Sequence, residues 1–177
     1  MNTPHLVEFK VDVSKWILDW VSQYNTALGV VPCPFAKQAL LNEKIDWVFV
    51  ESLSQLELKL MDLAKKGLKN EVVVIGMNPN NVRPSDLTQT IRIYNKRLLM
   101  PHNIVALEDH PSDVEKVNGV TMNQGKWAMV LLQNTSKLNN ASEILRTQGY
   151  YDKWTQEELD DVVTWRFEKE KNENFNR

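Results

Sequence analysis

The sequence predicts an α/β fold, in which helices cover a mainly parallel, mixed sheet of four or five strands in two or three layers. Three observations predict it. Helical and strand patterns alternate through the middle of the chain, as in parallel sheets. The length of 177 residues suits a single domain, which we expect to span 1–177. Hydrophobic residues make up 42 % and charged residues 25 %, a composition typical of a chain that buries a core.

The first third of the chain predicts two helices and a strand. Apolar residues recur at helical spacing over 14–28, with Ser14 as the N-cap and Gly29 as the residue that ends the helix. A shorter helix is expected over 34–42, because proline suits a first helical turn. The alternating, β-branched segment 45–51 predicts the first strand.

The central part of the chain continues the alternation. Ser54 and Glu57 have the spacing of a capping box, and the helix that they open should stop near Gly67. The run VVVIGM over 72–77 is typical of a strand buried on both faces. The next helix begins with Pro-Ser-Asp and extends over 84–98, since its apolar residues form one stripe.

Three further strand signals follow. Segments 103–108 and 127–133 predict strands, and Val-Asn-Gly-Val over 117–120 predicts a hairpin. We expect the strand over 127–133, with or without the hairpin, to extend one edge of the sheet.

A helical C-terminal segment over 137–170 should pack on this domain. It contains two predicted helices, 137–148 and 156–170, and Thr155 with Glu158 has capping-box spacing at the start of the second.

Composition restricts the function classes. The chain has 21 basic and 23 acidic residues, and this balance argues against general nucleic-acid binding and against attraction to an anionic membrane. No apolar run approaches the roughly 20 residues of a membrane helix. A secretory signal pattern is absent, and a single cysteine excludes an internal disulfide. We therefore expect a cytoplasmic protein.

Polar residues follow the strand over 72–77. Asn78, Asn80 and Arg83 precede the N-terminus of a helix, at the strand end where open parallel sheets place their ligands. A cationic side chain beside a helix N-terminus favours an anionic group. These residues are therefore candidates for binding a polar or anionic small molecule.

Glu108 ends the next predicted strand, and Asp109 and His110 follow it. His110 is a candidate general base, with Asp109 or Glu108 as the carboxylate that orients it. The alternative is a hydrogen-bonded loop histidine with a structural role.

Cys33 precedes the short predicted helix, where the helix dipole favours a thiolate, and Lys37 lies one turn further on. If that helix runs antiparallel to the strand over 45–51, Cys33 lies at the same sheet edge as His110. Cys33 is then a candidate nucleophile or redox thiol with His110 as its base. The alternative is a buried structural cysteine.

Metal and cofactor signals are weak. His102 and His110 with one carboxylate could form a two-histidine, one-carboxylate set, but their spacing is not diagnostic, so we expect no metal. The sequence lacks the glycine-rich nucleotide fingerprints. The cofactor therefore stays unknown.

Two resemblances bear on these residues. A Trp-containing helix (Trp16 to Trp20), the motif Cys33-Pro34-Phe35 and a strand ending at Glu108-Asp109-His110-Pro111 resemble an uncharacterised family of bacterial proteins over about residues 14–111. This resemblance implies the α/β architecture and singles out Cys33 and His110, but it implies no particular reaction.

The second resemblance is local. Residues 33–40, Cys-Pro-Phe-Ala followed by Lys-Gln-Ala-Leu, resemble the active-site helix start of glutaredoxins. Ala36 stands where that family has its second cysteine, so the resemblance implies no dithiol chemistry.

Two functions remain open. The first is a small enzyme of unknown reaction that acts on a polar or anionic molecule through a Cys33–His110 site. The alternative is a non-catalytic binding or assembly protein whose C-terminal aromatic residues dock a partner or a second copy: Tyr150, Tyr151, Trp154 and Trp165.

Overall fold

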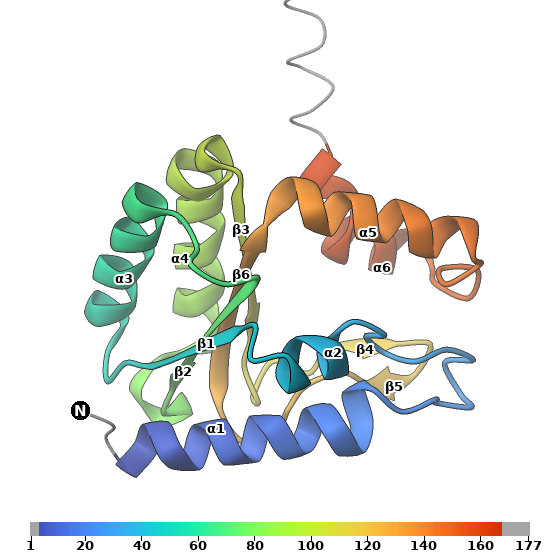
Figure 1. Cartoon of the computed structure of the whole chain (residues 1–177), viewed down its shortest axis with the longest axis horizontal. Coiled ribbons are helices and arrows are strands. Elements are labelled where there is room, and N and C mark those ends of the chain that lie inside the picture. The colour runs from blue at the N-terminus through green and yellow to red at the C-terminus, as the bar shows by residue number, and fades with distance from the viewer. Residues whose placement is uncertain (1–3, 168–177) are drawn as a thin grey trace, which may run out of the picture.

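The structure, a computed structural model, describes residues 4–167 and is built around a four-stranded sheet in the order β1-β2-β6-β3 (Figure 1). The strands are β1 (Ile45–Phe49), β2 (Val72–Met77), β3 (Ile104–Asp109) and β6 (Ala128–Asn134). β1 pairs parallel with β2, and β6 pairs antiparallel with both β2 and β3. β1, β2 and β3 therefore run in one direction, and the predicted mixed α/β sheet is confirmed.

The predicted place of the last strand at a sheet edge is wrong, because β6 lies between β2 and β3. The side chains of β6 are mostly buried on both faces, which a central strand allows. The hairpin forms as predicted, from β4 (Lys116–Val117) and β5 (Val120–Thr121), but it is a separate two-stranded sheet. β3 is an edge strand of the sheet. A side chain takes the place of a neighbouring strand there, because the Asn95 carboxamide pairs with both backbone polar groups of Ala106.

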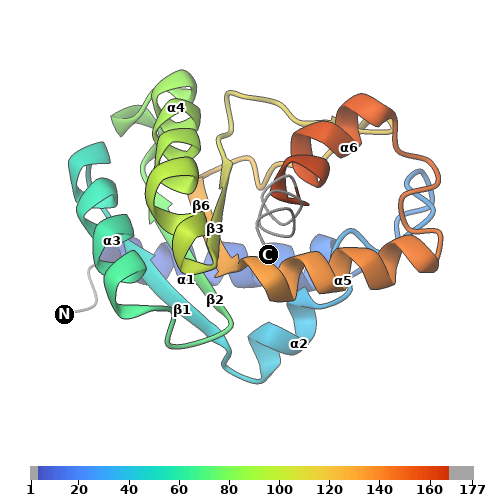
Figure 2. The same ribbon diagram turned by 90° about the horizontal axis from the view of Figure 1, so that it is seen from above.

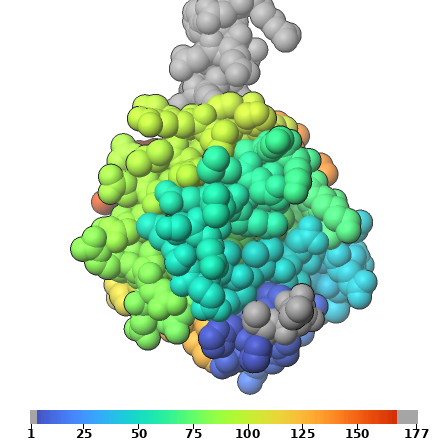
Figure 3. Space-filling view, turned by 90° about the vertical axis from the view of Figure 1, so that its left-hand side faces the viewer, coloured from blue at the N-terminus to red at the C-terminus, as the bar shows by residue number. Residues whose placement is uncertain are grey.

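Helices α3 (Leu53–Lys66) and α4 (Pro84–Tyr94) cover one face of the sheet, and Figure 3 shows α3 at the centre of that side of the molecule. α3 ends at Gly67 as predicted, but its N-cap is Ser52, whose side chain accepts a hydrogen bond from the Gln55 amide. α4 continues into a π-helical turn, η3 (Asn95–Leu99). The core on this side contains Leu56, Leu60, Ile75, Leu87, Ile91, Val130 and Leu132.

The opposite face is covered by α1 (Pro4–Trp16), a π-helical turn η1 (Ile17–Val21) and α2 (Ala36–Leu41), as Figure 2 shows from above. The bounds predicted for the first helix, 14–28, are therefore wrong. The inward side chains repeat every four residues from well before Ser14, and this repeat extends the helix toward the N-terminus. They are Phe9, Val13, Ile17 and Val21. Because helices cover both faces of the sheet, the fold has three layers.

The C-terminal part contains α5 (Thr135–Thr147), α6 (Gln156–Val162) and a short 3₁₀ turn, η5 (Thr164–Phe167). The capping box of Thr155 and Glu158 is confirmed, with both reciprocal hydrogen bonds present. The second predicted helix is shorter than expected, and its residues 168–170 lie outside the described part.

Candidate functional site

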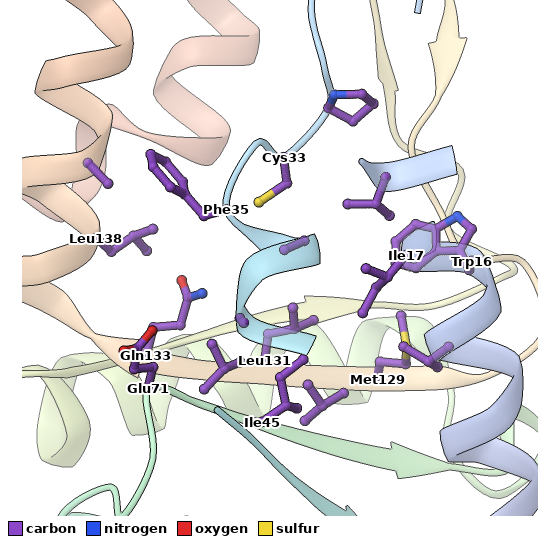
Figure 4. Close-up of a pocket in the computed structure, with 18 of the residues that line it drawn as sticks. Trp16, Ile17, Cys33, Phe35, Ile45, Glu71, Met129, Leu131, Gln133 and Leu138 are labelled. Carbon is purple, nitrogen blue, oxygen red and sulfur yellow. The ribbon is translucent and has the colours of Figure 1, made fainter. Parts of the chain in front are cut away.

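A largely apolar cavity of about 420 Å³ lies on the sheet face covered by α1 and α2 (Figure 4). Its floor is formed by β1, β2 and β6, with Val74, Met129 and Leu131 among the floor residues. Its walls come from α1, η1, α2 and α5. The volume falls within the roughly 300–1,000 Å³ that small-molecule sites occupy.

Small side chains explain why this space is not filled. The helices that face the floor present Ala36 and Ala39 from α2 and Ala141 from α5. On the other side of the cavity, Trp16 and Trp20 stack with ring centroids 5.8 Å apart. The alanines are too short to reach the floor, and the stacked indoles form a firm apolar wall.

The π-helical turn η1 shapes the same wall. Ile17, Trp20 and Val21 belong to it and line the cavity. The Ile17 carbonyl oxygen accepts from both the Ser22 amide at 3.0 Å and the Ser22 hydroxyl at 2.7 Å, and these two bonds close the turn. Single π-helical turns inside α-helices are frequent at functional sites.

Polar side chains gather at only one end of the cavity. Glu71 precedes β2, Gln133 lies near the end of β6, and Lys137 is in the first turn of α5. Figure 4 shows Glu71 and Gln133 together at this end, with Trp16 and Met129 at the other. The cavity is therefore amphipathic along its length.

Cys33 lines the cavity, and its sulfur lies among apolar side chains that include Phe35 (Figure 4). Burial raises the pKa of the Cys33 thiol, and backbone hydrogen bonds from Phe35 and Ala36 only partly oppose this. The neutral thiol is therefore the favoured form at neutral pH, and a thiolate nucleophile is disfavoured. Lys37, the predicted helper, lies exposed on α2 and is not part of the lining.

Two contacts hold the chain around Cys33 in place. The Tyr150 hydroxyl donates to the Pro32 carbonyl oxygen from the loop after α5. The Asn118 side chain, at the tip of the β4–β5 hairpin, donates to the Ala27 carbonyl oxygen at 2.8 Å. Segments that are far apart in sequence thus hold the chain that leads to Cys33.

His110 has both ring nitrogens engaged with the backbone. Nε2 donates to the Val82 carbonyl oxygen at 3.1 Å, and Nδ1 accepts from the Ser112 amide at 3.1 Å. The ring is 5 % exposed. These contacts tie the end of β3 to the loop after β2, so the arrangement suits a structural histidine.

The two carboxylates next to His110 point to opposite faces of the sheet, as neighbouring strand residues do. Asp109 accepts from Asn123 at 2.7 Å and from the Gln124 amide at 2.9 Å. Burial raises the pKa of Glu108 and of Asp109, against the hydrogen bonds that each carboxylate receives. The Asp109 carboxylate therefore anchors the segment after the hairpin, and Asn123 is a partner that the sequence did not indicate.

The polar residues after β2 do meet His110. Asn80, Arg83 and His110 line a second, more open recess of about 510 Å³ at the carboxyl end of β2. Asn78 caps the short turn there by accepting from the Asn80 amide at 2.9 Å. Arg83 is exposed and pairs with Asp86 at 2.8 Å.

The predicted meeting of Cys33 with His110 is not found. Cys33 packs with the core on the α1 side of the sheet, whereas His110 bonds to Val82, which belongs to the core on the α3 side. α2 has six residues and spans only about 9 Å at 1.5 Å per residue. It is therefore too short to place its own N-terminus, and Cys33 just before it, beside the carboxyl end of β1. Cys33 instead shares its cavity with Ile45 and Val72, the first residues of β1 and β2.

The weaker metal hypothesis finds no support in residues 4–167, where no group of three or more His, Cys, Asp and Glu side chains is placed to hold an ion. His102 and His110 lie beyond opposite ends of β3. The His102 ring contacts the Leu98 carbonyl oxygen at 2.7 Å.

The C-terminal aromatic residues pack on one another. Tyr151 lies edge-on to Tyr150 and to Trp154, with ring centroids 4.9 and 5.2 Å apart. All three are half-buried, as is Trp165. They therefore form part of the body of the protein rather than an exposed docking patch.

Comparison of the chain with protein-family models, with curated proteins and with solved structures gave no match. Among residues 4–167, no helix is both long enough and apolar enough to cross a membrane.

Proposed function

We propose that this protein is a binding protein for a small, largely apolar molecule, which it holds in the cavity between the sheet, α1, α2 and α5. The cavity itself is the observation that supports the proposal: about 420 Å³ of space with mostly apolar walls in contact with the packed core. An apolar cavity without a ligand forfeits packing contacts that a ligand would restore.

Binding without catalysis agrees best with the chemistry of the walls. Outside the polar end of the cavity, Cys33 is the only ionisable side chain among the described residues that line it. Burial keeps its thiol neutral. His110 lies on the other side of the sheet and cannot serve as its base.

The experiment titrates the protein with the uncharged fluorophore N-phenylnaphthylamine, whose emission rises in apolar surroundings. A second readout is alkylation of Cys33, because it is the only cysteine of the chain and lines the cavity. We expect saturable fluorescence and slower alkylation when the probe is bound.

Variants that fill the cavity provide the control. Ala36→Phe and Ala141→Phe enter from different helices and should each weaken probe binding at least about tenfold, because a phenyl ring occupies the ligand's space. Leu41→Phe lies on α2 with 61 % exposure and should leave binding unchanged. Equal binding by all three folded variants would refute the proposal.

The recess at the carboxyl end of β2 supports a second candidate, the binding of a small polar or anionic molecule. Asn80 and Arg83 line it beside His110, as the sequence predicts. If the candidate holds, phosphate or a small dicarboxylate should shift the backbone amide resonances of residues 79–86, and Arg83→Ala should abolish the shifts.

A further inference from the structure

The arrangement of polar groups in the apolar cavity narrows the class of its ligand. This step rests on the proposed function and concerns the head group of the bound molecule. Four polar side chains line one end, and three of them have no hydrogen bond or ion pair to any group of the described part of the chain: Glu71, Gln133 and Lys137. The fourth, Asn134, accepts from the Lys137 amide at 3.0 Å.

The two charged side chains at this end carry charges of opposite sign. Glu71 and Lys137 are both exposed, so water screens each of them. One carries a negative and the other a positive charge. This end of the cavity therefore offers little net attraction to an anionic or a cationic head group.

Gln133 differs from these two because it is half-buried and lies on the cavity floor in β6. Its carboxamide carries both a donor and an acceptor, and neither is used by a side chain of residues 4–167. Water can reach this half-buried amide, and a neutral ligand group that both donates and accepts would replace that water without loss of hydrogen bonds.

We infer that the ligand is an amphipathic molecule with a neutral, hydrogen-bonding head group, such as a hydroxyl or an amide, held by Gln133 while its apolar body extends toward Trp16 and Met129. The distance supports an elongated body. Gln133 and Met129 are four residues apart on β6, which corresponds to about 13 Å along a strand.

The test compares three molecules with the same chain and different heads: octanol, octanoate and octylammonium. Each displaces N-phenylnaphthylamine from the wild-type protein at neutral pH. We expect octanol to bind roughly five- to tenfold more tightly than either charged molecule, because a charged head loses hydration that this end does not replace.

The variant Gln133→Leu keeps the size of the side chain and removes its hydrogen-bonding groups. It should reduce octanol affinity about fivefold more than it reduces the affinity of octanoate or octylammonium. Gln38→Leu, on the exposed side of α2, is the matched control and should change none of these affinities.

The outcomes separate the two proposals. If the fluorophore binds but octanoate or octylammonium equals octanol, or Gln133→Leu leaves octanol binding intact, the head-group inference is wrong and the binding function stands. If neither the fluorophore nor any of the three molecules binds, the proposed function fails, and the inference fails with it.

Discussion

The ring of Phe9 occupies the space that a side chain at Gly76 would need. A Cβ built on Gly76 would lie 2.6 Å from three carbon atoms of that ring, far inside the roughly 3.5–4.0 Å of a normal carbon contact. Phe9 is fully buried and lies edge-on to Trp47 and Trp127, at centroid distances of 6.0 and 5.9 Å. The aromatic rings leave it no room to withdraw, so α1 lies this close to β2 only because residue 76 is a glycine.

Gly76→Ala should therefore destabilise the protein by about 1–3 kcal/mol, the usual cost of overpacking a core. Urea unfolding followed by tryptophan fluorescence measures it. In a Phe9→Leu background, the added methyl group meets a smaller side chain, and the cost should fall by at least half. An equal cost in both backgrounds would show that the Phe9 ring is not the cause.

A second link holds α1 to the sheet and depends on pH. Asp12 accepts from the Lys126 ammonium at 2.6 Å and from the Trp127 indole Nε1 at 2.9 Å. The hydrogen bond from Lys126 lowers the pKa of Asp12, burial opposes it, and the hydrogen bond from Trp127 and the charge of Lys126 keep the net shift downward. The folded state therefore favours the ionised carboxylate. This stabilisation is complete above the unfolded pKa of about 3.9 and is lost as the pH falls through the lower folded value.

Asp12→Asn keeps an acceptor for Trp127 but removes the charge. We expect it to lower the free energy of unfolding at pH 7 by no more than about 1 kcal/mol and to flatten the decline between about pH 4 and pH 2. Urea titrations at several pH values measure both effects. Asp19→Asn is the control, because Asp19 is exposed and lies about two helical turns beyond Asp12. The same flattening in both variants would argue against the Lys126 contact.

Local signals in the sequence account for much of this fold. β2 has the predicted bounds because a continuous apolar run is buried wherever it pairs. The hairpin tip has positive φ at Asn118 and Gly119, as an Asn-Gly turn requires. The place of β6 between β2 and β3 was not predictable in the same way, because strand pairing depends on contacts between segments distant in sequence.

The same distinction applies to the site. Asn80, Arg83 and His110 come together as predicted, since each follows the carboxyl end of a strand that runs in the same direction. The position of Cys33 depended on the length and direction of α2, which local patterns do not fix. The cavity was not predicted, because it exists where side chains such as that of Ala36 are too short to fill the space over Leu131.

A substitution of Asn95, at the edge of the sheet, should have a large effect on the stability of the protein. Its carboxamide donates to the Ala106 carbonyl oxygen at 2.7 Å and accepts from the Ala106 amide at 2.8 Å, as a neighbouring strand would. Asn95 is 4 % exposed, so water cannot replace these bonds without rearrangement.

Asn95→Leu should cost about 2–4 kcal/mol, because it leaves a buried donor and a buried acceptor unpaired. Amide hydrogen exchange should speed up at Ala106 more than in β1, on the far side of the sheet. Ser136→Ala, the comparison, also removes a side-chain hydrogen bond near β3, from the exposed Ser136 hydroxyl to Asn103, and should cost less. If Asn95→Leu leaves exchange at Ala106 unchanged, the edge of β3 has another partner.

The reactivity of Cys33 separates the structural view of this residue from the catalytic one. Because burial raises the pKa of its thiol, alkylation by iodoacetamide at pH 7 should be slower than that of a small free thiol and should accelerate only at a higher pH than the free thiol needs. Unfolding in urea should remove the difference. The matched control is Gln38→Cys in a Cys33→Ser background, since Gln38 is exposed on the same helix, and this thiol should react at the free rate. Alkylation of Cys33 faster than the control at pH 7 would mean that the cavity stabilises a thiolate, and the catalytic hypothesis for Cys33 would then regain its basis.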